Sequence, residues 1–437
     1  MKTIYIRDLL PNISTTLLCW ISNRRTSKNE VFFDVYDSTG CIQVVASRNQ
    51  CTDFELLAKL RRESAVAFTG SLSVDGDFVL SSYRVLANAT AEISPSPNEG
   101  YFDVLAKQHE RQVIEHPTFY IRNHQLRAIY YIKSVFKREI QDYFWSRNFV
   151  EFESPTLTKQ TLYDDSGAIW LDVEHQNISL SRCATFHLEP AAIAYEKVFT
   201  ITNSHADEKV KTNRHLVEYL HLKAEMCWVD LDELIALAAD MYYEVSLSTF
   251  KKCKDQFGLI ISEDDVLKKL NTLNPKNHKM ITYDEAVEIL RNYDIPFEYG
   301  KSLTSKQEAL LTEHFGNRFL WVKYIPYTVE GFMFKRKEDN SFLTMTCDLI
   351  APDGFGEILG CAEKMTDYND LISSMKEKGK FCDYSRYEDY ALLHSYGLPQ
   401  HGGIGMGIER ALRFLLGVSH VKYVKPFAVV KGSQINH

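Results

Sequence analysis

The sequence predicts an α+β protein in two parts, a small β-barrel followed by a larger domain whose antiparallel sheet is flanked by helices. Three observations lead to this prediction. The chain has 437 residues, which is more than one ordinary hydrophobic core accommodates. Short strand-like runs fill residues 13–90. From residue 120 onwards, strand-like runs are mixed with helical runs, which is typical of α+β domains.

Residues 1–93 are expected to form a five-stranded barrel of the OB type. The strand-like runs, separated by Asp-Ser-Thr-Gly and Asp-Gly turns, are STTLLCWISNRR, NEVFFDVYDSTG, CIQVVASR, SAVAFTGSLSVDG and DFVLSSYRVLAN. A helical piece, DFELLAKLRRE, lies between the third and fourth runs, as it does in OB barrels. Residues 94–119 begin with SPSPNEG, and this change in composition predicts a hinge or linker.

The larger domain is expected over residues 120–437. Apolar residues recur at helical spacing in LRAIYYIKSVFKREIQDYFWSRNF and DLDELIALAADMYYEVSLSTFKK, which predicts two long helices. The runs KVFTIT, HLKAEMCW, FLWVKYIP, FLTMTCDLIAP and GEILGCAEK predict the strands of the sheet. Residues 250–285 are charged and helical, so we expect an insertion or surface helices there.

The composition is that of an ordinary globular enzyme, with 45% hydrophobic and 25% charged residues. The formal net charge of −8 means that any nucleic-acid binding must be local. Nine cysteines without a CxxC motif argue against a disulfide framework or a zinc site and favour the reducing cytoplasm. We expect no signal peptide and no membrane span, because no sufficiently long apolar run occurs.

One stretch of the barrel, WISNRRTSKNEVFFDV, interleaves aromatic and basic residues. Aromatic side chains on an OB sheet stack on single-stranded bases, at about 1–3 kcal/mol per base. Strand alternation requires that one of Phe32 and Phe33 faces the core. The alternative is that these aromatic residues alternate between core and surface without any ligand. The candidates for nucleic-acid contact are Trp20, Arg24, Arg25, Phe32 and Gln43.

Three groups of residues in the larger domain have the chemistry of a nucleotide site. The hairpin HADEKVKTNRHLVEY contains Glu208, Arg214, His215, Glu218 and Tyr219, although such residues are more often found at a solvated hairpin tip.

The second group is Asp348 and Glu357, which flank a Pro/Gly turn and can hold Mg²⁺ together with phosphate oxygens; the alternative is a solvated turn. The third is GIGMGIERALRF, where Gly405 and Gly407 allow close backbone approach and Arg410 offers a fork for a terminal phosphate. A dinucleotide-binding βαβ unit is excluded here, because only 30 residues follow Gly407.

In this order, behind an OB-like barrel, these segments resemble a class II aminoacyl-tRNA synthetase of the aspartyl/asparaginyl subgroup, and most of all the asparaginyl enzymes. FVEFESPTLT resembles motif 1, VFTITNSHADEKVKTNRHLVEY motif 2, GGIGMGIERALRFLLG motif 3, and DLIAPDGFGEILG the metal-binding strand. WISNRRTSK and FFDVYDSTGCIQVV resemble the anticodon-binding barrel, with Phe32 stacking and Gln43 reading a base. The resemblance also implies a homodimer with Pro155 of motif 1 at its interface.

The resemblance implies a role for each matching residue. ATP would be contacted by Glu208, Arg214 and His215, with Tyr219 stacked on adenine, and Gly405 and Gly407 beside it. Asp348 and Glu357 would bind Mg²⁺, while Arg410 would hold the γ-phosphate. Glu208 and Arg410 are the expected catalytic residues. Leu188 and Glu189, in TFHLEP, match the asparaginyl type, and Glu218 is assigned to the substrate pocket.

The chain departs from the family where the amino acid is held. The motif 2 arginine that joins the α-phosphate to the amino-acid carboxylate falls on Ala206. Loss of such a donor costs about 10²-fold or more in rate. A pocket glutamine falls on Thr185, and an arginine falls on Lys364, which keeps the charge but loses the fork. A barrel arginine falls on Ser22.

Three functions therefore compete. The favoured one is an ATP- and Mg²⁺-dependent ligase that activates a different, asparagine- or aspartate-like carboxylate for amide or ester formation. The first alternative is a genuine asparaginyl-tRNA synthetase, in which Lys209 or Lys211 would have to substitute for the missing arginine. The second alternative is a non-catalytic regulator that binds tRNA or protein; it predicts changes in the ATP residues too, which the sequence does not show.

Overall fold

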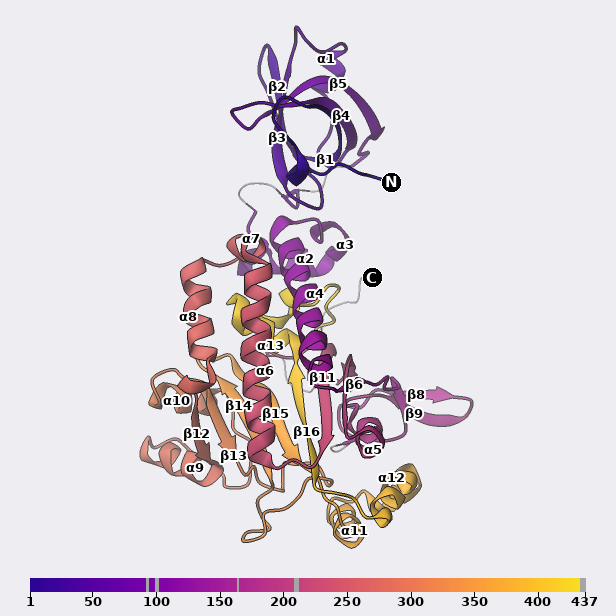
Figure 1. Ribbon diagram of the computed structural model, residues 1–437, viewed down its shortest axis with the longest axis vertical. Coiled ribbons are helices and arrows are strands. Elements are labelled where there is room, and N and C mark those ends of the chain that lie inside the picture. The colour runs from indigo at the N-terminus through magenta and orange to yellow at the C-terminus, as the bar shows by residue number, and fades with distance from the viewer. Residues whose placement is uncertain (92–93, 99–101, 163–164, 208–211, 433–437) are drawn as a thin grey trace. The chain divides into compact units, whose positions relative to one another are not determined.

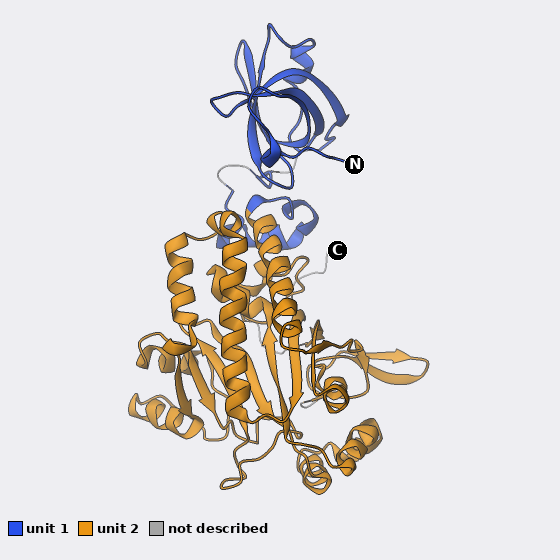
Figure 2. Ribbon diagram, in the orientation of Figure 1, with its two compact units in different colours: residues 1–124 blue, residues 125–437 orange. Residues whose placement is uncertain are grey.

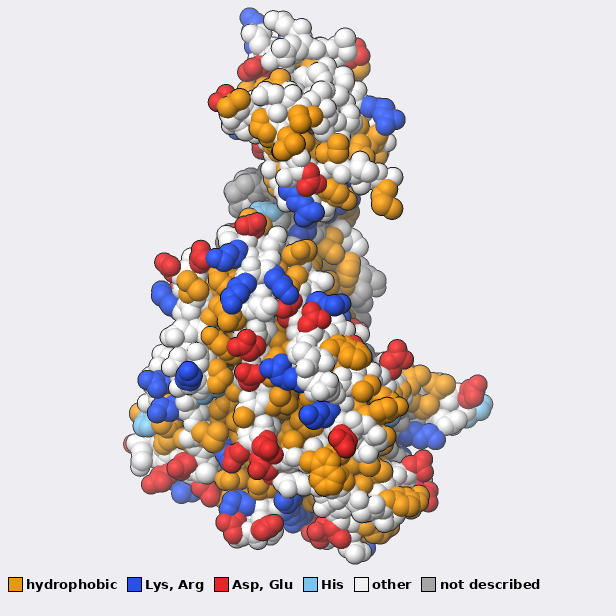
Figure 3. Space-filling model, in the orientation of Figure 1, with side chains coloured by type: hydrophobic (Ala, Val, Ile, Leu, Met, Phe, Trp, Pro, Cys, Tyr) orange, Lys and Arg blue, Asp and Glu red, His pale blue; other side chains and the backbone are white. Residues whose placement is uncertain are grey.

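The computed structural model describes residues 1–91, 94–98, 102–162, 165–207 and 212–432. It divides into two compact units, Met1–His124 and Gln125–His437, each with its own core (Figure 2). Within the described residues no helix combines the length and the apolar character needed to cross a membrane. On the face shown in Figure 3, basic and acidic side chains are interspersed over the larger unit.

The first unit contains a closed barrel with the strand order β1-β2-β3-β5-β4, which confirms the predicted OB type. Its elements are β1 (Ser14–Thr26), β2 (Glu30–Tyr36), β3 (Cys41–Ser47), α1 (Phe54–Leu57), β4 (Ala65–Leu72) and β5 (Phe78–Ala87). Alternate residues of β1, such as Leu17, Cys19 and Ile21, fill the barrel core. Phe33 of β2 is fully buried there, whereas Phe32 lies half-buried on the outer face.

The rest of the first unit consists of short helices before and after the barrel. They are η1 (Ile6–Asp8), η2 (Lys107–His109), α2 (Glu110–Glu115) and α3 (Pro117–Tyr120). Phe102 stacks on Tyr120 with ring centroids 5.1 Å apart, so this segment has a small core of its own. The assignment of residues 94–119 as a hinge or linker stays a prediction.

The second unit is built on an eight-stranded sheet with the order β12-β13-β14-β15-β16-β11-β10-β6. Its strands are β6 (Val150–Glu151), β10 (Lys197–His205), β11 (Glu218–Cys227), β12 (Lys279–Thr282), β13 (Leu320–Lys323), β14 (Thr346–Ala351), β15 (Gly356–Glu363) and β16 (His401–Gly407). Among the described strands of this sheet, only the pairs β12/β13 and β10/β6, at its two edges, are parallel. The prediction of an α+β domain with an antiparallel sheet is therefore confirmed.

Helices cover this sheet. They are α4 (His124–Trp145), α5 (Thr185–Tyr195), α6 (Leu231–Lys252), α7 (Lys254–Gly258), α8 (Glu263–Leu273), α9 (Tyr283–Asn292), α10 (Ser305–His314), α11 (Tyr368–Glu377), α12 (Glu388–Leu393) and α13 (Ile408–Leu416). The short helices η3 (Pro275–Asn277), η4 (Phe381–Arg386), η5 (His394–Tyr396) and η6 (Val421–Val424) and a small sheet of β7 (Leu157–Thr158), β9 (Gln176–Leu180) and β8 (Trp170–Val173) complete the unit. Residues 250–285 contain α7, α8 and the edge strand β12.

The long helix α6 packs along one face of the sheet, over β15 and β16 (Figure 1). It begins at a capping box, in which Asp230 accepts a hydrogen bond from the backbone N–H of Glu233 at 2.8 Å, and Glu233 accepts one from the backbone N–H of Asp230 at 2.9 Å. Gly402 of β16 faces α6, where it leaves room for Leu234. The opposite face of the sheet therefore stays open for a site.

Phe33 and Phe32 provide a matched test of the barrel. Phe33→Ala removes a fully buried ring and should cost about 3–5 kcal/mol of unfolding free energy. Phe32→Ala removes a ring that is already in contact with water, so its loss should be much smaller. Urea denaturation of the full chain measures both, and equal losses would show that the two residues do not alternate between core and surface.

Candidate active site

A cavity of about 520 Å³ lies on the open face of the sheet. It is lined by β11, β14, β15 and β16, with further residues from the loops around them. Its polar lining divides into two ends, one rich in carboxylates and arginines and the other containing lysines. A volume of this size suits a small-molecule substrate.

Glycines of β16 form the floor of the cavity. In the β11/β16 register, His221, Lys223 and Glu225 lie opposite Gly407, Gly405 and Gly403. A Cβ added at Gly405 would lie 2.7 Å from Lys223 Nζ, and one at Gly403 would lie 2.3 Å from Glu225 Oε2. Glycine is thus required at positions 403 and 405 because any larger side chain would collide with Glu225 or Lys223.

Carboxylates gather at one end of the cavity. Burial, together with Glu357, Glu330 and Glu308, raises the pKa of Asp348 well above its usual value. Burial also raises the pKa of Glu330 to about 7. Burial opposes the charge of Glu357 as well, but Arg410 and other nearby cations outweigh it and lower the pKa of this carboxyl. This end therefore contains more carboxyl groups than its cations compensate, and the raised pKa values of Asp348 and Glu330 reflect burial together with repulsion from neighbouring carboxylates.

The described residues contain no group of three or more His, Cys, Asp and Glu side chains arranged around a metal position. Mg²⁺ does not require such a group, because it is commonly held by one or two carboxylates together with phosphate oxygens and water. Asp348 and Glu357, half-buried and close enough to shift each other's pKa, fit that pattern.

Two arginines form ion pairs with carboxylates at this end. Arg410 Nη1 lies 3.3 Å from Glu357 Oε1, and Arg410 Nε donates to the carbonyl of Arg214 at 3.3 Å. Arg214 Nη1 in turn lies 2.5 Å from Glu308 Oε2. Gly356 has a φ of +76°, and a Cβ there would lie 2.3 Å from Arg214 Nη1, so this position suits only glycine.

The structure thus brings most of the predicted nucleotide residues together in one cavity. They are Arg214, His215, Tyr219, Asp348, Glu357, Gly405, Gly407 and Arg410. His215 Nδ1 is 2.6 Å from Thr212 Oγ1, and the Tyr219 ring lies 5.5 Å from the His221 ring. Glu208, together with Lys209 and Lys211, lies outside the described residues.

The predicted acid-pocket residues occupy two layers. Ala206 and Lys364 line the cavity itself. Thr185 lies behind it, with its Oγ1 donating to Glu225 Oε1 at 3.3 Å. Glu189 is also behind the cavity, and its neighbour Leu188 belongs to the core cluster that α5 forms against the sheet.

Glu218 does not line this cavity, contrary to its predicted place in the substrate pocket. It precedes Tyr219 on β11, and neighbouring residues of a strand point to opposite faces. Its carboxylate pairs with Lys425 Nζ at 2.8 Å and borders a separate cavity that also contains Lys133.

The sequence interpretation missed Lys223, which lines the cavity between Tyr219 and Glu225 on the same strand. Alternation from Tyr219 places residues 221, 223 and 225 on the cavity face, so strand periodicity was the signal available. It also missed Glu308 and Glu330, for which the local sequence contains no comparable pattern.

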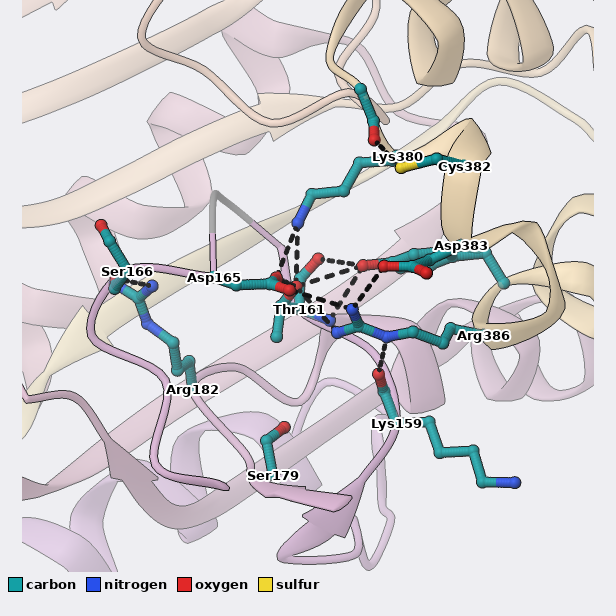
Figure 4. A network of polar contacts seen from close by, with 12 residues as sticks. Lys159, Thr161, Asp165, Ser166, Ser179, Arg182, Lys380, Cys382, Asp383 and Arg386 are labelled. Atoms are coloured by element: carbon teal, nitrogen blue, oxygen red, sulfur yellow. Dashed lines mark hydrogen bonds and ion pairs between the residues drawn. The ribbon is translucent and has the colours of Figure 1, made fainter. Parts of the chain in front are cut away.

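A network of polar contacts anchors one wall of the cavity (Figure 4). Asp165 accepts a hydrogen bond from Thr161 Oγ1 at 2.5 Å and pairs with Lys380 Nζ at 3.1 Å and Arg386 Nη1 at 3.0 Å. Burial opposes the charge of Asp165, but these donors lower its pKa. Arg182, which lines the cavity, donates to the carbonyl of the residue after Asp165 at 3.2 Å.

On the barrel, three nucleic-acid candidates share one outer patch. Arg25 Nη2 donates to Gln43 Oε1 at 2.5 Å, and its guanidinium lies 5.9 Å from the centre of the Phe32 ring. Arg24 is not part of this patch, because neighbouring residues of a strand point to opposite faces and Arg24 precedes Arg25 on β1. The Nη1 of Arg24 donates to the carbonyl of Leu60 at 2.7 Å.

Trp20 is 41% exposed and stacks on Tyr36 at 5.8 Å, so it presents an aromatic surface of its own. Ser22 is buried at the bulge in β1 and donates to the carbonyl of Asp34 at 2.8 Å. In the second unit, Pro155 is exposed in the loop after β6.

A largely antiparallel sheet with this cavity, in a chain that also contains an OB barrel, is the architecture that the resemblance to class II aminoacyl-tRNA synthetases implies. Comparison with known families agrees. Residues 109–431 match the family described as tRNA synthetases class II (D, K and N), and residues 16–88 match the OB-fold nucleic acid binding domain. The chain belongs to this class II family, whose members are ligases.

Within the family, the chain is asparaginyl-tRNA synthetase-like. It is 28% identical to the asparagine–tRNA ligase of Lactobacillus delbrueckii subsp. bulgaricus over 93% of each chain, and 28% identical to that of Pyrococcus abyssi over 98% of each. The asparaginyl-tRNA synthetase from Pyrococcus horikoshii, solved in complex with asparaginyl-adenylate, superposes with a TM-score of 0.91 at 25% identity over 99% of both chains. The enzyme from Entamoeba histolytica shares the fold, with a TM-score of 0.85 at 22% identity over 98% of this chain and 97% of that one.

The buried ion network behind the cavity predicts how stability depends on pH. Burial opposes both charges, but hydrogen bonding to His401 and the charge of Lys364 lower the pKa of Glu189 to about 2, and Glu189 raises the pKa of His401. The contribution of Glu189 is present above its unfolded pKa of 4.5 and is lost as the pH falls toward 2. The contribution of His401 is present below 6.5 and is lost as the pH rises through its higher folded pKa.

His401→Gln should therefore lower the free energy of unfolding at about pH 6 and flatten its decline toward about pH 9. Urea denaturation across this range measures the effect. His175→Gln, at an exposed position of the turn between β8 and β9, is the control and should leave the profile unchanged. An unaltered decline in His401→Gln would contradict the assignment.

Proposed function

We propose that this protein is an ATP- and Mg²⁺-dependent ligase of the synthetase family that activates a carboxylic acid other than asparagine, for amide or ester formation. One observation carries the proposal. Ala206 stands at the cavity wall, 5% exposed, where the family resemblance implies an arginine. The end of the same cavity that contains carboxylates and arginines, which we call the nucleotide end, includes Asp348, Glu357 and Arg410.

The nucleotide end supplies what ATP needs. Arg410 offers its planar fork to the terminal phosphate, and Arg214 adds a second cation, held in place by Glu308. Tyr219 presents a ring for the adenine. Asp348 and Glu357 would hold Mg²⁺, which would neutralise phosphate charge there.

Activation consists of an attack by a carboxylate oxygen on the α-phosphorus, with release of pyrophosphate and formation of a mixed anhydride with AMP. Negative charge develops on the α-phosphate during this step, and a fixed cation there stabilises it. Ala206 provides none, because its side chain is a methyl group and its backbone N–H is already bonded to the carbonyl of Val217 at 2.9 Å. The acid must therefore be held in this cavity without an arginine at position 206.

Two further candidates compete with this proposal. The relatives that are 28% identical over nearly the whole chain favour a genuine asparaginyl-tRNA synthetase that charges tRNA. A non-catalytic regulator that binds tRNA or protein is disfavoured, because Arg214, Arg410, Asp348 and Glu357 all line the cavity.

We further propose that the protein acts in the cytoplasm as a homodimer, with Pro155 at the interface. The patch of Arg25, Phe32 and Gln43 supports tRNA as a partner, through stacking and hydrogen bonding of unpaired bases.

Pyrophosphate exchange and tRNA charging with purified protein, across amino acids and other carboxylic acids, separate these candidates. The proposal predicts ATP-dependent exchange with an acid other than asparagine, and little with asparagine itself. Robust asparagine-dependent exchange together with charging of tRNA(Asn) would contradict the proposal and show that the protein is a genuine asparaginyl-tRNA synthetase. Absence of Mg-ATP binding in calorimetry would instead favour the regulator.

Ala206→Arg tests the missing cation directly. If the vacancy at Ala206 alone blocks asparagine, this variant should raise asparagine-dependent exchange by about 10²-fold, the usual effect of one positioned donor. An increase of that size would show that the rest of the pocket still accepts asparagine and would contradict a rebuilt acid site. We expect no such increase. Ala206→Gln, similar in length but neutral, is the control for the added bulk.

A further inference from the structure

The end of the cavity that contains lysines, which we call the acid end because it would hold the acid substrate, has a cation that none of the functions above uses. Lys223 lies in the middle of β11, which is hydrogen-bonded to β10 on one side and β16 on the other. Its backbone position is therefore fixed, and its Nζ lies over Gly405 on the floor of the cavity. The side chain is half-buried because it faces the cavity.

Lys223 has no carboxylate partner within ion-pair distance among the described residues. The nearby acids are occupied by the other lysine of this end: Lys364 Nζ lies 3.4 Å from Glu225 Oε1 and 3.8 Å from Glu189 Oε2. Glu189 also accepts hydrogen bonds from Tyr390 and His401.

Cys183 is the closest polar neighbour of Lys223, but a thiol is a weak acceptor and does not replace a counter-ion. Burial, Lys223 and Arg410 together hold the pKa of the adjacent His221 well below its usual value, so that imidazole is neutral. Burial opposes the charge of Lys223 itself, but Cys183 and Glu225 outweigh it and raise the pKa of the amine, which stays protonated. The ammonium is thus available to a ligand.

A second polar atom faces the same space. Glu225 is 1% exposed, and its Oε2 has no hydrogen-bond partner in the described part of the chain. This oxygen lies over Gly403, two residues from Gly405 on the same strand. Residues two apart on a strand are separated by roughly 7 Å. An acceptor and a cation at about that spacing can contact two different polar groups of one small acid of four or five carbons.

The charges at this end disfavour an ammonium on the substrate. An α-ammonium would be the third such group beside Lys223 and Lys364, and Glu225 is already paired with Lys364. Like charges brought together in a partly dry site oppose binding strongly. A neutral hydroxyl or amide donor satisfies Glu225 Oε2 without this repulsion, and a second carboxylate neutralises Lys223.

We propose that this site takes a small, amine-free dicarboxylic acid, with one carboxylate bound to Lys223, a hydroxyl or amide donor on Glu225, and the other carboxylate presented to ATP. The proposal rests on the proposed function and names its substrate class. In this arrangement the non-reacting carboxylate is held from the floor of the cavity and needs no cation from the hairpin that contains Ala206.

The test is calorimetric binding of malate, succinate, aspartate and asparagine to the full chain, with and without Mg²⁺ and a non-hydrolysable ATP analogue. Malate should bind about 100-fold more tightly than asparagine and more tightly than aspartate, the amine-bearing counterpart of malate. Lys223→Met should abolish the preference for malate over asparagine, and Lys223→Glu should reverse it. Lys323→Met is the matched control, because this lysine lies on the other face of the sheet, paired with Asp232, and its loss should leave the preference unchanged.

Aspartate or asparagine binding as tightly as malate would overturn the proposal. So would a Lys223→Met variant that keeps the preference, or one that loses affinity for the ATP analogue alone, which would place Lys223 at a phosphate. Thermal unfolding of each variant shows whether it is folded. Failure of the proposed function can be distinguished from failure of this inference. If the proposed function is wrong, ATP binding and exchange are not observed, but acid binding measured without nucleotide still tests the role of Lys223.

Discussion

The pairing of β11 with β16 determines what the cavity contains, because the glycines of β16 leave space for charged side chains that project from β11. Side chains at Gly403 and Gly405 would collide with Glu225 and Lys223. Next to them, Gly360 of β15 lies between Asp348 and Gly405 in the same row of the sheet. A flat glycine surface therefore separates the carboxylate end from the lysine end, and a ligand that joins a nucleotide to an acid fits across it.

The two ends have diverged to different degrees from the family resemblance. At the nucleotide end, Arg214, Arg410, Asp348 and Glu357 match the pattern expected for Mg-ATP. At the acid end, Ala206 stands where the resemblance implies an arginine, and Lys223 lines the cavity from β11. We propose that this cation approaches the substrate from a different direction and so changes the substrate without any change of fold.

Much of the fold was predictable from the sequence, because it depends on periodicity and turn chemistry. The barrel strands, the two long helices and the alternation of Phe32 and Phe33 follow from patterns within a few residues. Glu218 was assigned to the wrong face, although the same alternation from Tyr219 was available. The Arg214–Glu308 pair joins residues 94 positions apart, and no local pattern encodes it. Partners of that kind depend on how the sheet is ordered, which the sequence interpretation did not resolve strand by strand.

A crystal structure of the protein with Mg²⁺, a non-hydrolysable ATP analogue and asparagine tests most directly whether the nucleotide end is kept and the acid end is changed. We expect the metal between Asp348 and Glu357, the triphosphate along Arg214 and Arg410, and no ordered asparagine beside Lys223. Asparagine seated against Lys223 with its carboxylate at the α-phosphate would contradict a changed acid site. A cavity without nucleotide would contradict the ligase itself.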